Sequence, residues 1–331
     1  MDESSPANYT VRRLTPIDAQ AIPELTNRVN GPGYIHAEVY HPERLLRLNE
    51  SGQLVSVVAL HSEGVVGHCA LERPDLGPLA ESGEAMVLPE HQHHHLLDRM
   101  KIALDEEARK LGLAAIFGNA VTHHVFSQRT EERFKGRPTS FLLAASPAQA
   151  HRLPADYPQR VSLLCYFTFL CEPGGTVAHL PDNHRPIIGK IYELLGRKVE
   201  FRAPGATRGP GELSSSYDPA TQKGVIKVAE PGSDSAARID EARHGLMQNF
   251  GAEVIYLELP LDRPATANLC QRAEELGFFF SGLSPQAPGS GDWLRLQFLK
   301  RPIDFSLLQI EGEFARELLS YIEAERSRVK R

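Results

Sequence analysis

The alternation of apolar and polar positions predicts strands and helices in turn along the first half of the chain. Residues 96–111 are predicted to form a long helix, because apolar side chains recur every three or four positions on one face: Leu97, Met100, Leu104, Ala108 and Leu111. Gly112 follows as a stop signal. Short apolar runs bounded by turn residues predict strands at residues 9–14, 54–61, 64–71, 84–88, 113–117 and 140–145.

The second half has a similar order of elements. Strands are predicted at residues 161–170, 224–228, 254–259, 278–282 and 293–299, and helices at 185–195, 235–250, 264–276 and 311–326. Residues 202–217 are rich in Gly, Pro and Ser and are expected to be a mobile loop. Two prolines between residues 151 and 159 favour a boundary there. We therefore expect an α/β (α+β) fold with two similar domains in tandem, residues 1–152 and 153–331, each a central mixed sheet flanked by helices.

Composition narrows the class of protein. The chain has 331 residues, of which 41% are hydrophobic, and a net charge of −6 without a basic block before its last residues, so a nucleic-acid surface is not expected. No apolar run approaches the roughly 18 residues of a membrane span. The four cysteines contain no CxxC pair, which favours a reduced, cytoplasmic setting. A small-molecule partner is expected, and a homodimer is possible.

The segment around Val87-Leu88-Pro89 carries a family resemblance. A strand ending in V-x-P, a polar loop and a long helix ending in L-G are similar to the central segment of the GNAT acetyltransferase superfamily. Val65-Val66-Gly67 resembles the strand that precedes this segment, and the likeness covers about residues 8–147. In the second half, residues 252–278, ending in the family's "LGF", resemble the later part of the same fold. The resemblance implies a tandem GNAT-like protein.

The resemblance also implies a cofactor site. Acetyl-CoA or another acyl-CoA would be the co-substrate, with its pyrophosphate at the amides that precede the long helix and its pantetheine arm along the strand edge. The implied cofactor-binding residues are Met86, Val87, Gln92, His93, His94, His95, Leu96, Leu97 and Ser127. His93 and His95 stand where the family has glycines, and Ser127 replaces a more usual asparagine. In the second copy, Pro231–Asp234 has a single glycine, and Asp234 is expected to cap a helix and to repel phosphate.

Transfer of an acyl group to an amine requires a base, because only the neutral amine attacks the thioester. Glu84, on the strand before the loop, and His124, after the next strand, are the candidate catalytic residues. The family's tyrosine acid has no match, since Arg133 and Phe134 occupy that neighbourhood. The expected function is transfer of an acyl group from acyl-CoA to the amine of a small molecule.

Two alternatives remain open from the sequence. The chain could be a non-catalytic protein that senses CoA or another nucleotide, as the lost glycines and the missing tyrosine suggest. The histidines at positions 91, 93, 94 and 95 could instead bind a metal, although no Cys or Asp lies nearby in the sequence to complete a tetrahedral set. No metal ligand is assigned on this basis.

Overall fold

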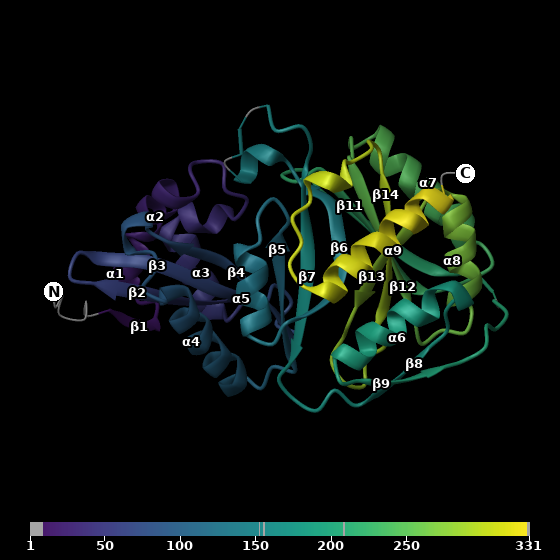
Figure 1. Ribbon diagram of the computed structural model, residues 1–331, viewed down its shortest axis with the longest axis horizontal. Helices are drawn as coiled ribbons and strands as arrows, with labels where there is room; N and C mark the ends of the chain where they lie inside the picture. The colour runs from purple at the N-terminus through teal and green to yellow at the C-terminus, as the bar shows by residue number, and fades with distance from the viewer. Residues whose placement is uncertain (1–8, 152, 155, 208, 330–331) are drawn as a thin grey trace. The chain divides into compact units, whose positions relative to one another are not determined.

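The computed structural model describes residues 9–151, 153–154, 156–207 and 209–329. The chain divides into two compact units. Unit 1 comprises Met1–Gly118 with Gln149–Ala155, and unit 2 comprises Asn119–Ala148 with Asp156–Arg331. Figure 1 colours the chain by residue number and labels the elements of both units.

Unit 1 is built on a mixed sheet in the order β1-β2-β3-β4-β5. The first four strands are antiparallel neighbours, and β4 and β5 are parallel. The strands are β1 (Thr10–Arg13), β2 (Leu54–His61), β3 (Gly64–Glu72), β4 (Leu79–Val87) and β5 (Ala115–Val121), the last of which continues into unit 2. The helices are α1 (Pro16–Ala19), α2 (Ile22–Val29), α3 (Pro42–Ser51) and α4 (Leu96–Lys110), with the short turns η1 (Ala37–Tyr40) and η2 (Pro89–His91).

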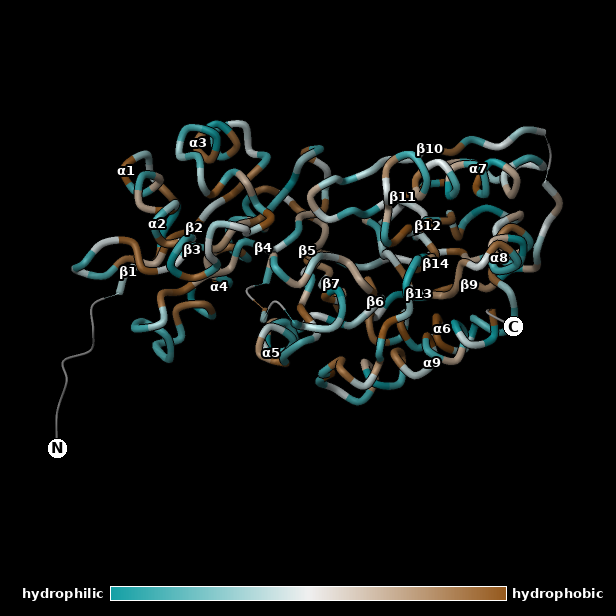
Figure 2. Tube along the Cα trace, turned by 90° about the horizontal axis from the view of Figure 1, so that it is seen from above, coloured by the Kyte–Doolittle hydropathy of each residue, from teal (hydrophilic) through white to brown (hydrophobic). Residues whose placement is uncertain are grey.

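Helices cover both faces of this sheet. Helix α4 packs on β2 and β3, while α2 and α3 pack from the other side (Figure 2). Residues 54–59 of β2 are consequently all buried, which explains why this strand is continuously apolar instead of alternating. At the end of α4, Gly112 has a left-handed φ of 66°, as expected of a helix stop.

In unit 2, the strands of the large sheet follow the order β7-β6-β13-β14-β12-β11-β10, and β8 and β9 form a separate parallel pair. Its strands are β6 (Arg137–Ser146), β7 (Val161–Phe169), β8 (Gly175–Ala178), β9 (Lys198–Phe201), β10 (Glu212–Asp218), β11 (Lys223–Glu230), β12 (Val254–Pro260), β13 (Phe279–Ser284) and β14 (Trp293–Leu299). Strands β11 and β12 are parallel, while the pairs β7–β6, β6–β13, β13–β14, β14–β12 and β11–β10 are antiparallel.

The helices of unit 2 are α5 (Phe126–Arg133), α6 (Arg185–Leu194), α7 (Ser235–Gln248), α8 (Thr266–Glu275) and α9 (Glu313–Val329). The short turns of unit 2 are η4 (Asp182–His184) and η5 (Phe305–Leu307), whereas η3 (Ala148–His151) begins at the last residue of a unit 2 segment and continues in unit 1. Helices α6 and α9 pack on β6 and β13, and α7 lies on the opposite side of the sheet, against β11 (Figure 2).

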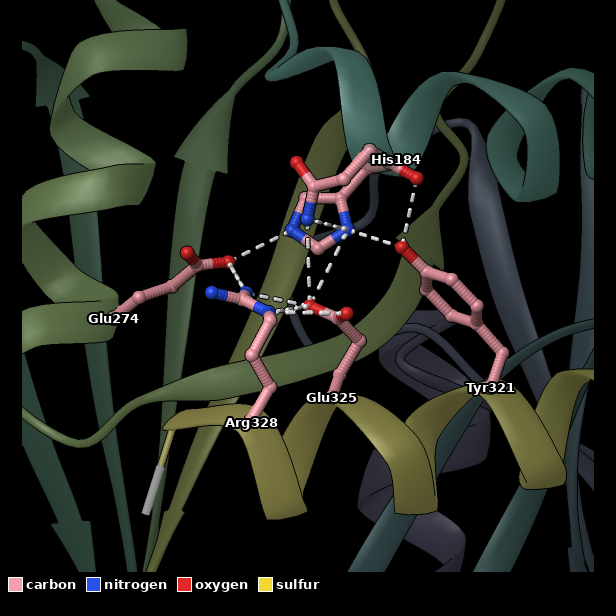
Figure 3. Close-up of polar contacts among 6 residues, drawn as sticks. His184, Glu274, Tyr321, Glu325 and Arg328 are labelled. Atoms are coloured by element: carbon pink, nitrogen blue, oxygen red, sulfur yellow. Dashed lines mark hydrogen bonds and ion pairs between the residues drawn. The ribbon is translucent and has the colours of Figure 1, made fainter. Parts of the chain in front are cut away.

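A buried polar network fixes the C-terminal helix to its unit (Figure 3). The His184 ring lies 2.9 Å from Glu274 Oε1 through Nε2 and 2.8 Å from the Tyr321 hydroxyl through Nδ1. Arg328 of α9 pairs with Glu274 at 2.7 Å and with Glu325 at 2.6 Å. These contacts join η4, α8 and α9. Because hydrogen bonds and ion pairs are directional, they fix the orientation of α9 more specifically than apolar contacts alone would.

The structure differs from the sequence predictions at three places. The strand expected from residue 84 begins at Leu79, because its first half is polar and small and lacks an apolar run. The segment 202–217 is not a single mobile loop, since the Ser-rich strand β10 occupies residues 212–218 at the sheet edge. The short strands β8 and β9 were not predicted.

Candidate functional site

Glu84 lies at a bulge in the middle of β4. Between the pairs His68–Met86 and Ala70–Gly83, β4 places two residues, Glu84 and Ala85, opposite the single residue Cys69 of β3. Glu84 has a φ of 51°, which is uncommon for a residue with a side chain. Its side chain is turned into the unit and is 1% exposed. A bulge of this kind re-aims one side chain out of the regular alternation of the strand.

Three further side chains converge on Glu84, and together they form what we call the Glu84 cluster: His36, Glu38, Glu72 and Glu84. The Nδ1 atom of His36 lies 3.5 Å from Glu72 Oε1, 3.6 Å from Glu38 Oε1 and 3.8 Å from Glu84 Oε1. His68 lies behind Glu84, with Nδ1 3.6 Å from Glu84 Oε2. His36, Glu38 and Glu72 are partly exposed, so Glu84 and His68 form the floor of the cluster.

The charges of the cluster are strongly coupled. Burial, together with the neighbouring carboxylates Glu72 and Glu38, raises the pKa of Glu84 well above its ordinary value. Burial lowers the pKa of His68 to about 4. Burial also opposes charge on His36, but the carboxylates of Glu38 and Glu72 outweigh it and raise its pKa to about 11. Burial and the charges of Glu84 and Glu72 raise the pKa of the Tyr34 phenol.

The strands β4 and β5 separate beyond the first part of their contact. Their parallel pairing covers only Leu79–Ala115, Ala80–Ile116 and Glu81–Phe117. Beyond Glu81, β4 continues for six residues paired with β3 alone, as far as Val87. Met86 is buried, and Val87 is partly exposed. The edge of β4 that faces β5 is therefore not paired with β5 beyond Glu81.

The loop between β4 and α4 has an unusual backbone. His93 and His95 both adopt a left-handed conformation, with φ values of 70° and 57°. His95 is the N-cap residue of α4 and has no side-chain cap hydrogen bond. Within the described part of the chain, no protein acceptor satisfies the amides of residues 93–97. These donors, with the partial positive charge of a 15-residue helix, form an arrangement suited to an anion.

The histidines of this loop are held differently from one another. His91 is buried, with Nδ1 3.0 Å from the Tyr9 hydroxyl and Nε2 3.2 Å from Glu63 Oε2. His93, His94 and His95 are exposed. Among the described residues, the groups of three or more potential metal ligands include His91 with His61 and Glu63, but none of the other three loop histidines. The structure therefore does not bring the four histidines together as one ligand set.

The corresponding corner of unit 2, between β11 and α7, is filled by its own chain. The Gly232 amide donates to Ser235 Oγ at 2.8 Å, and the Ser233 amide donates to the Gly209 carbonyl at 2.9 Å. Asp234 is the N-cap residue of α7, but its carboxylate accepts the Gly211 amide at 2.6 Å and makes no cap hydrogen bond, in contrast to the capping role that the sequence predicts. The donors of this corner are thus used internally.

Over about half of its length, the chain is similar in structure to many GNAT acetyltransferases. A putative acetyltransferase of the GNAT family from Desulfovibrio desulfuricans matches with a TM-score of 0.39 and 14% identity, over 50% of this chain and 100% of that chain. A putative acetyltransferase from Salmonella typhimurium, solved with its cofactor acetyl-CoA, matches with a TM-score of 0.41 and 18% identity, over 50% of this chain and 96% of that chain.

An N-acetyltransferase from Thermoplasma acidophilum in complex with coenzyme A matches with a TM-score of 0.37 and 12% identity, over 49% of this chain and 99% of that chain. No family model matches this sequence, and no curated protein matches it. Within the described residues, no helix has both the length and the apolar character needed to span a membrane.

The other two residues predicted for the site, His124 and Ser127, belong to unit 2, whereas Glu84 and the β4–α4 loop belong to unit 1. His124 contacts the rings of His123 and Phe126. Burial lowers the pKa of His124. Among the described residues, His124 Nδ1 and Ser127 Oγ are buried atoms without a hydrogen-bond partner. A neutral imidazole of this kind can accept a proton.

Sequence reasoning identified Glu84 but missed the residues around it. His36, Glu38, Glu72 and His68 come from the loop after α2, from η1 and from β3. The loop sequence from Tyr34 to Glu38 places a histidine and a glutamate two positions apart, which is a weak signal by itself. Only the pairing of β3 with β4 brings Glu72 and His68 to the same place.

Proposed function

We propose that this chain is an acyl-CoA-dependent N-acyltransferase that acts on the amine of a small molecule. The observation that carries the proposal is the β4–α4 loop, where left-handed backbone at His93 and His95 leaves the amides of residues 93–97 available to a diphosphate. The sequence resemblance independently expects glycines at these two positions. The early separation of β4 from β5 supports the proposal, since it leaves a strand edge for the pantetheine amides.

In the proposed reaction, the amine nitrogen attacks the thioester carbon, the carbon–sulfur bond breaks and an amide bond forms. The amine loses a proton to a base, and the departing CoA thiolate takes one up. Glu84 and His124 are the proposed proton-transfer residues, as the sequence predicts. His124 has an unpartnered, buried Nδ1 atom, and Glu84 lies on the strand that leads to the loop.

Isothermal titration of the full chain with CoA and with acetyl-CoA tests the binding step. We expect one equivalent per chain, because the corner of unit 2 is filled. His94→Glu places a carboxylate in the β4–α4 loop and should weaken binding at least tenfold, while Ser233→Glu, at the exposed position of the corner in unit 2, should leave the affinity unchanged. Absence of CoA binding, or equal effects of the two variants, would contradict the proposal.

Amine-dependent loss of the thioester tests the chemical step. We expect turnover with at least one member of a panel of primary amines. If Glu84 is the base, Glu84→Gln should lower kcat at least a hundredfold, and if His124 is the base, His124→Ala should do so. Binding of acetyl-CoA without thioester loss across the panel would favour the second candidate, a CoA-sensing protein. The observation that favours this second candidate is that the chain has no match for the family's tyrosine acid, since Arg133 and Phe134 occupy that neighbourhood.

A further inference from the structure

We propose that the Glu84 cluster binds one divalent first-row transition-metal ion through His36 Nδ1 and the carboxylates of Glu38, Glu72 and Glu84. The inference goes beyond acyl transfer and does not depend on it. The four donor atoms all lie within 4.8 Å of one another. They come from two different parts of unit 1, since His36 and Glu38 belong to the connection between α2 and α3, while Glu72 and Glu84 belong to β3 and β4.

The distances within the cluster fit ligands around an ion better than they fit hydrogen bonds. An N–H···O hydrogen bond normally spans about 2.7–3.2 Å, but His36 Nδ1 stands 3.5 to 3.8 Å from its three carboxylate neighbours. Donors placed tetrahedrally about 2.1 Å from a metal ion lie about 3.4 Å apart. The distances from His36 Nδ1 to the three carboxylates are therefore slightly longer than those between the ligands of a bound metal ion.

Three buried oxygen atoms of the cluster make no hydrogen bond. Among the described residues, both carboxylate oxygens of Glu84 and Oε1 of Glu72 are buried atoms without a hydrogen bond. Glu84 is 1% exposed, so water does not compensate for the missing contacts. A buried carboxyl group that makes no hydrogen bond is costly even with the cationic His36 at 3.8 Å, and a metal ion held at this point would remove that cost.

Neighbouring residues place the donors without competing for them. Gly83 makes room for Glu72, because a Cβ atom at this glycine would lie 2.5 Å from Glu72 Oε1. Arg44 lies 3.9 Å from Oε2 of Glu38, which leaves Oε1 of Glu38 facing His36. His68 lies 3.6 Å from Glu84 Oε2, whereas His36 is nearest to Oε1, and His68 would orient the Glu84 carboxylate.

The donor types select the class of ion. Three carboxylates supply hard oxygen ligands, while the imidazole nitrogen favours a transition metal such as Mn²⁺, Fe²⁺ or Zn²⁺ over Mg²⁺ or Ca²⁺. Two other groups of potential ligands in the described residues are less suited. His91 already bonds Tyr9 beside Glu63, and His184 and Glu274 are satisfied by Tyr321 and by Arg328. An ion in the Glu84 cluster would tie the α2–α3 connection to the sheet.

The test is a Mn²⁺ titration of the chelator-treated full chain, in which electron paramagnetic resonance measures the free Mn²⁺ at each step. We expect one tight site per chain and a rise in Tm on addition of Mn²⁺. Glu84→Gln and His36→Ala should weaken Mn²⁺ binding at least tenfold. Glu63→Gln, in the group with His61 and His91, is the matched control and should leave the affinity within twofold of the wild type.

Glu72→Gln and Gly83→Ala keep the test decisive if Glu84→Gln fails to fold by circular dichroism, because they perturb the ligand set from its more exposed side. We expect both to weaken binding. Absence of a stoichiometric site, or loss of the site in Glu63→Gln with retention in the Glu72 and Glu84 variants, would overturn the inference. The readout needs no acyl-CoA, so failure of acyl transfer and failure of metal binding are separate results.

Discussion

His93 and His95 share a left-handed backbone conformation on either side of His94, directly before the first turn of α4. A left-handed conformation costs a residue with a side chain about 1–2 kcal/mol, whereas glycine adopts it freely. His94 is not left-handed, although it belongs to the same exposed loop. The loop thus keeps the backbone that two glycines would favour, while carrying imidazoles.

Replacement of His93, His94 and His95 one at a time by glycine tests the cost of the left-handed backbone conformation. Relative to His94→Gly, we expect His93→Gly and His95→Gly each to have a free energy of unfolding higher by about 1 kcal/mol, because only they relieve the left-handed cost. Urea unfolding of the three variants gives the comparison. Equal stabilities would show that the loop relaxes to an ordinary conformation and would remove the main support for an anion site.

Gly232 is predicted to be irreplaceable in the corner of unit 2. A Cβ atom there would collide with the backbone of Pro210 and Gly211, which cannot move as a flexible side chain could. We expect Gly232→Ala to lower the free energy of unfolding by about 3 kcal/mol. Gly33→Ala is the control, since a Cβ atom at Gly33 meets nothing within 4 Å and should be neutral or slightly stabilising. A tolerated Gly232→Ala would mean that this corner is loosely packed.

The buried ion pair between Arg197 and Asp292 is predicted to make a large contribution to the free energy of unfolding. Arg197 Nη1 lies 2.7 Å from Asp292 Oδ1, and both side chains are 0% exposed. Tyr192 also donates to this carboxylate, at 2.9 Å. Asp292→Asn leaves a buried guanidinium without its counter-charge, so we expect a loss of about 3–5 kcal/mol. Glu200→Gln, in an exposed pair with Arg202, should change stability by less than about 1 kcal/mol.

Acid stability is predicted to depend on Glu274. Burial opposes its ionisation, but hydrogen bonds from His184 and Arg328 outweigh it and lower its pKa below the ordinary 4.5. The groups that face it are His184, Cys270, Tyr321, Glu325 and Arg328. The pKa of Glu274 is lower in the folded protein than in the unfolded chain. Its ionisation therefore stabilises the fold fully at a pH above the unfolded pKa, and this stabilisation is lost as the pH falls through the folded pKa.

Urea unfolding between pH 6 and pH 3 measures this effect. Glu274→Gln should be less stable than the wild type at pH 6, by about 1–3 kcal/mol, and should lose less stability on acidification. Glu275→Gln is the matched control, because the Glu275 side chain is 61% exposed and its ion pair among the described residues is with Arg272. A pH profile of Glu274→Gln parallel to that of the wild type would contradict the assignment.

Local sequence pattern predicted much of the fold. The periodicity of residues 96–111 and the stop at Gly112 gave α4 nearly to the residue, because helix formation is decided within a few turns. Cys69, Cys165 and Cys270, which lie in apolar runs of the sequence, are buried. Strand β10 was missed because its Ser-rich sequence has no apolar face, and only pairing with β11 makes it a strand.

For the candidate site, the sequence by itself determined that Glu84 stands on the strand before the loop, and its resemblance to the GNAT segment predicted glycine-like positions at residues 93 and 95. Only the tertiary structure decided what surrounds Glu84. His36 and Glu84 are 48 positions apart, and they meet because a bulge in β4 turns one side chain inward while the register of β3 brings Glu72 beside it. Local propensity encodes turns and periodicity, but such convergence depends on strand pairing and packing across the whole unit.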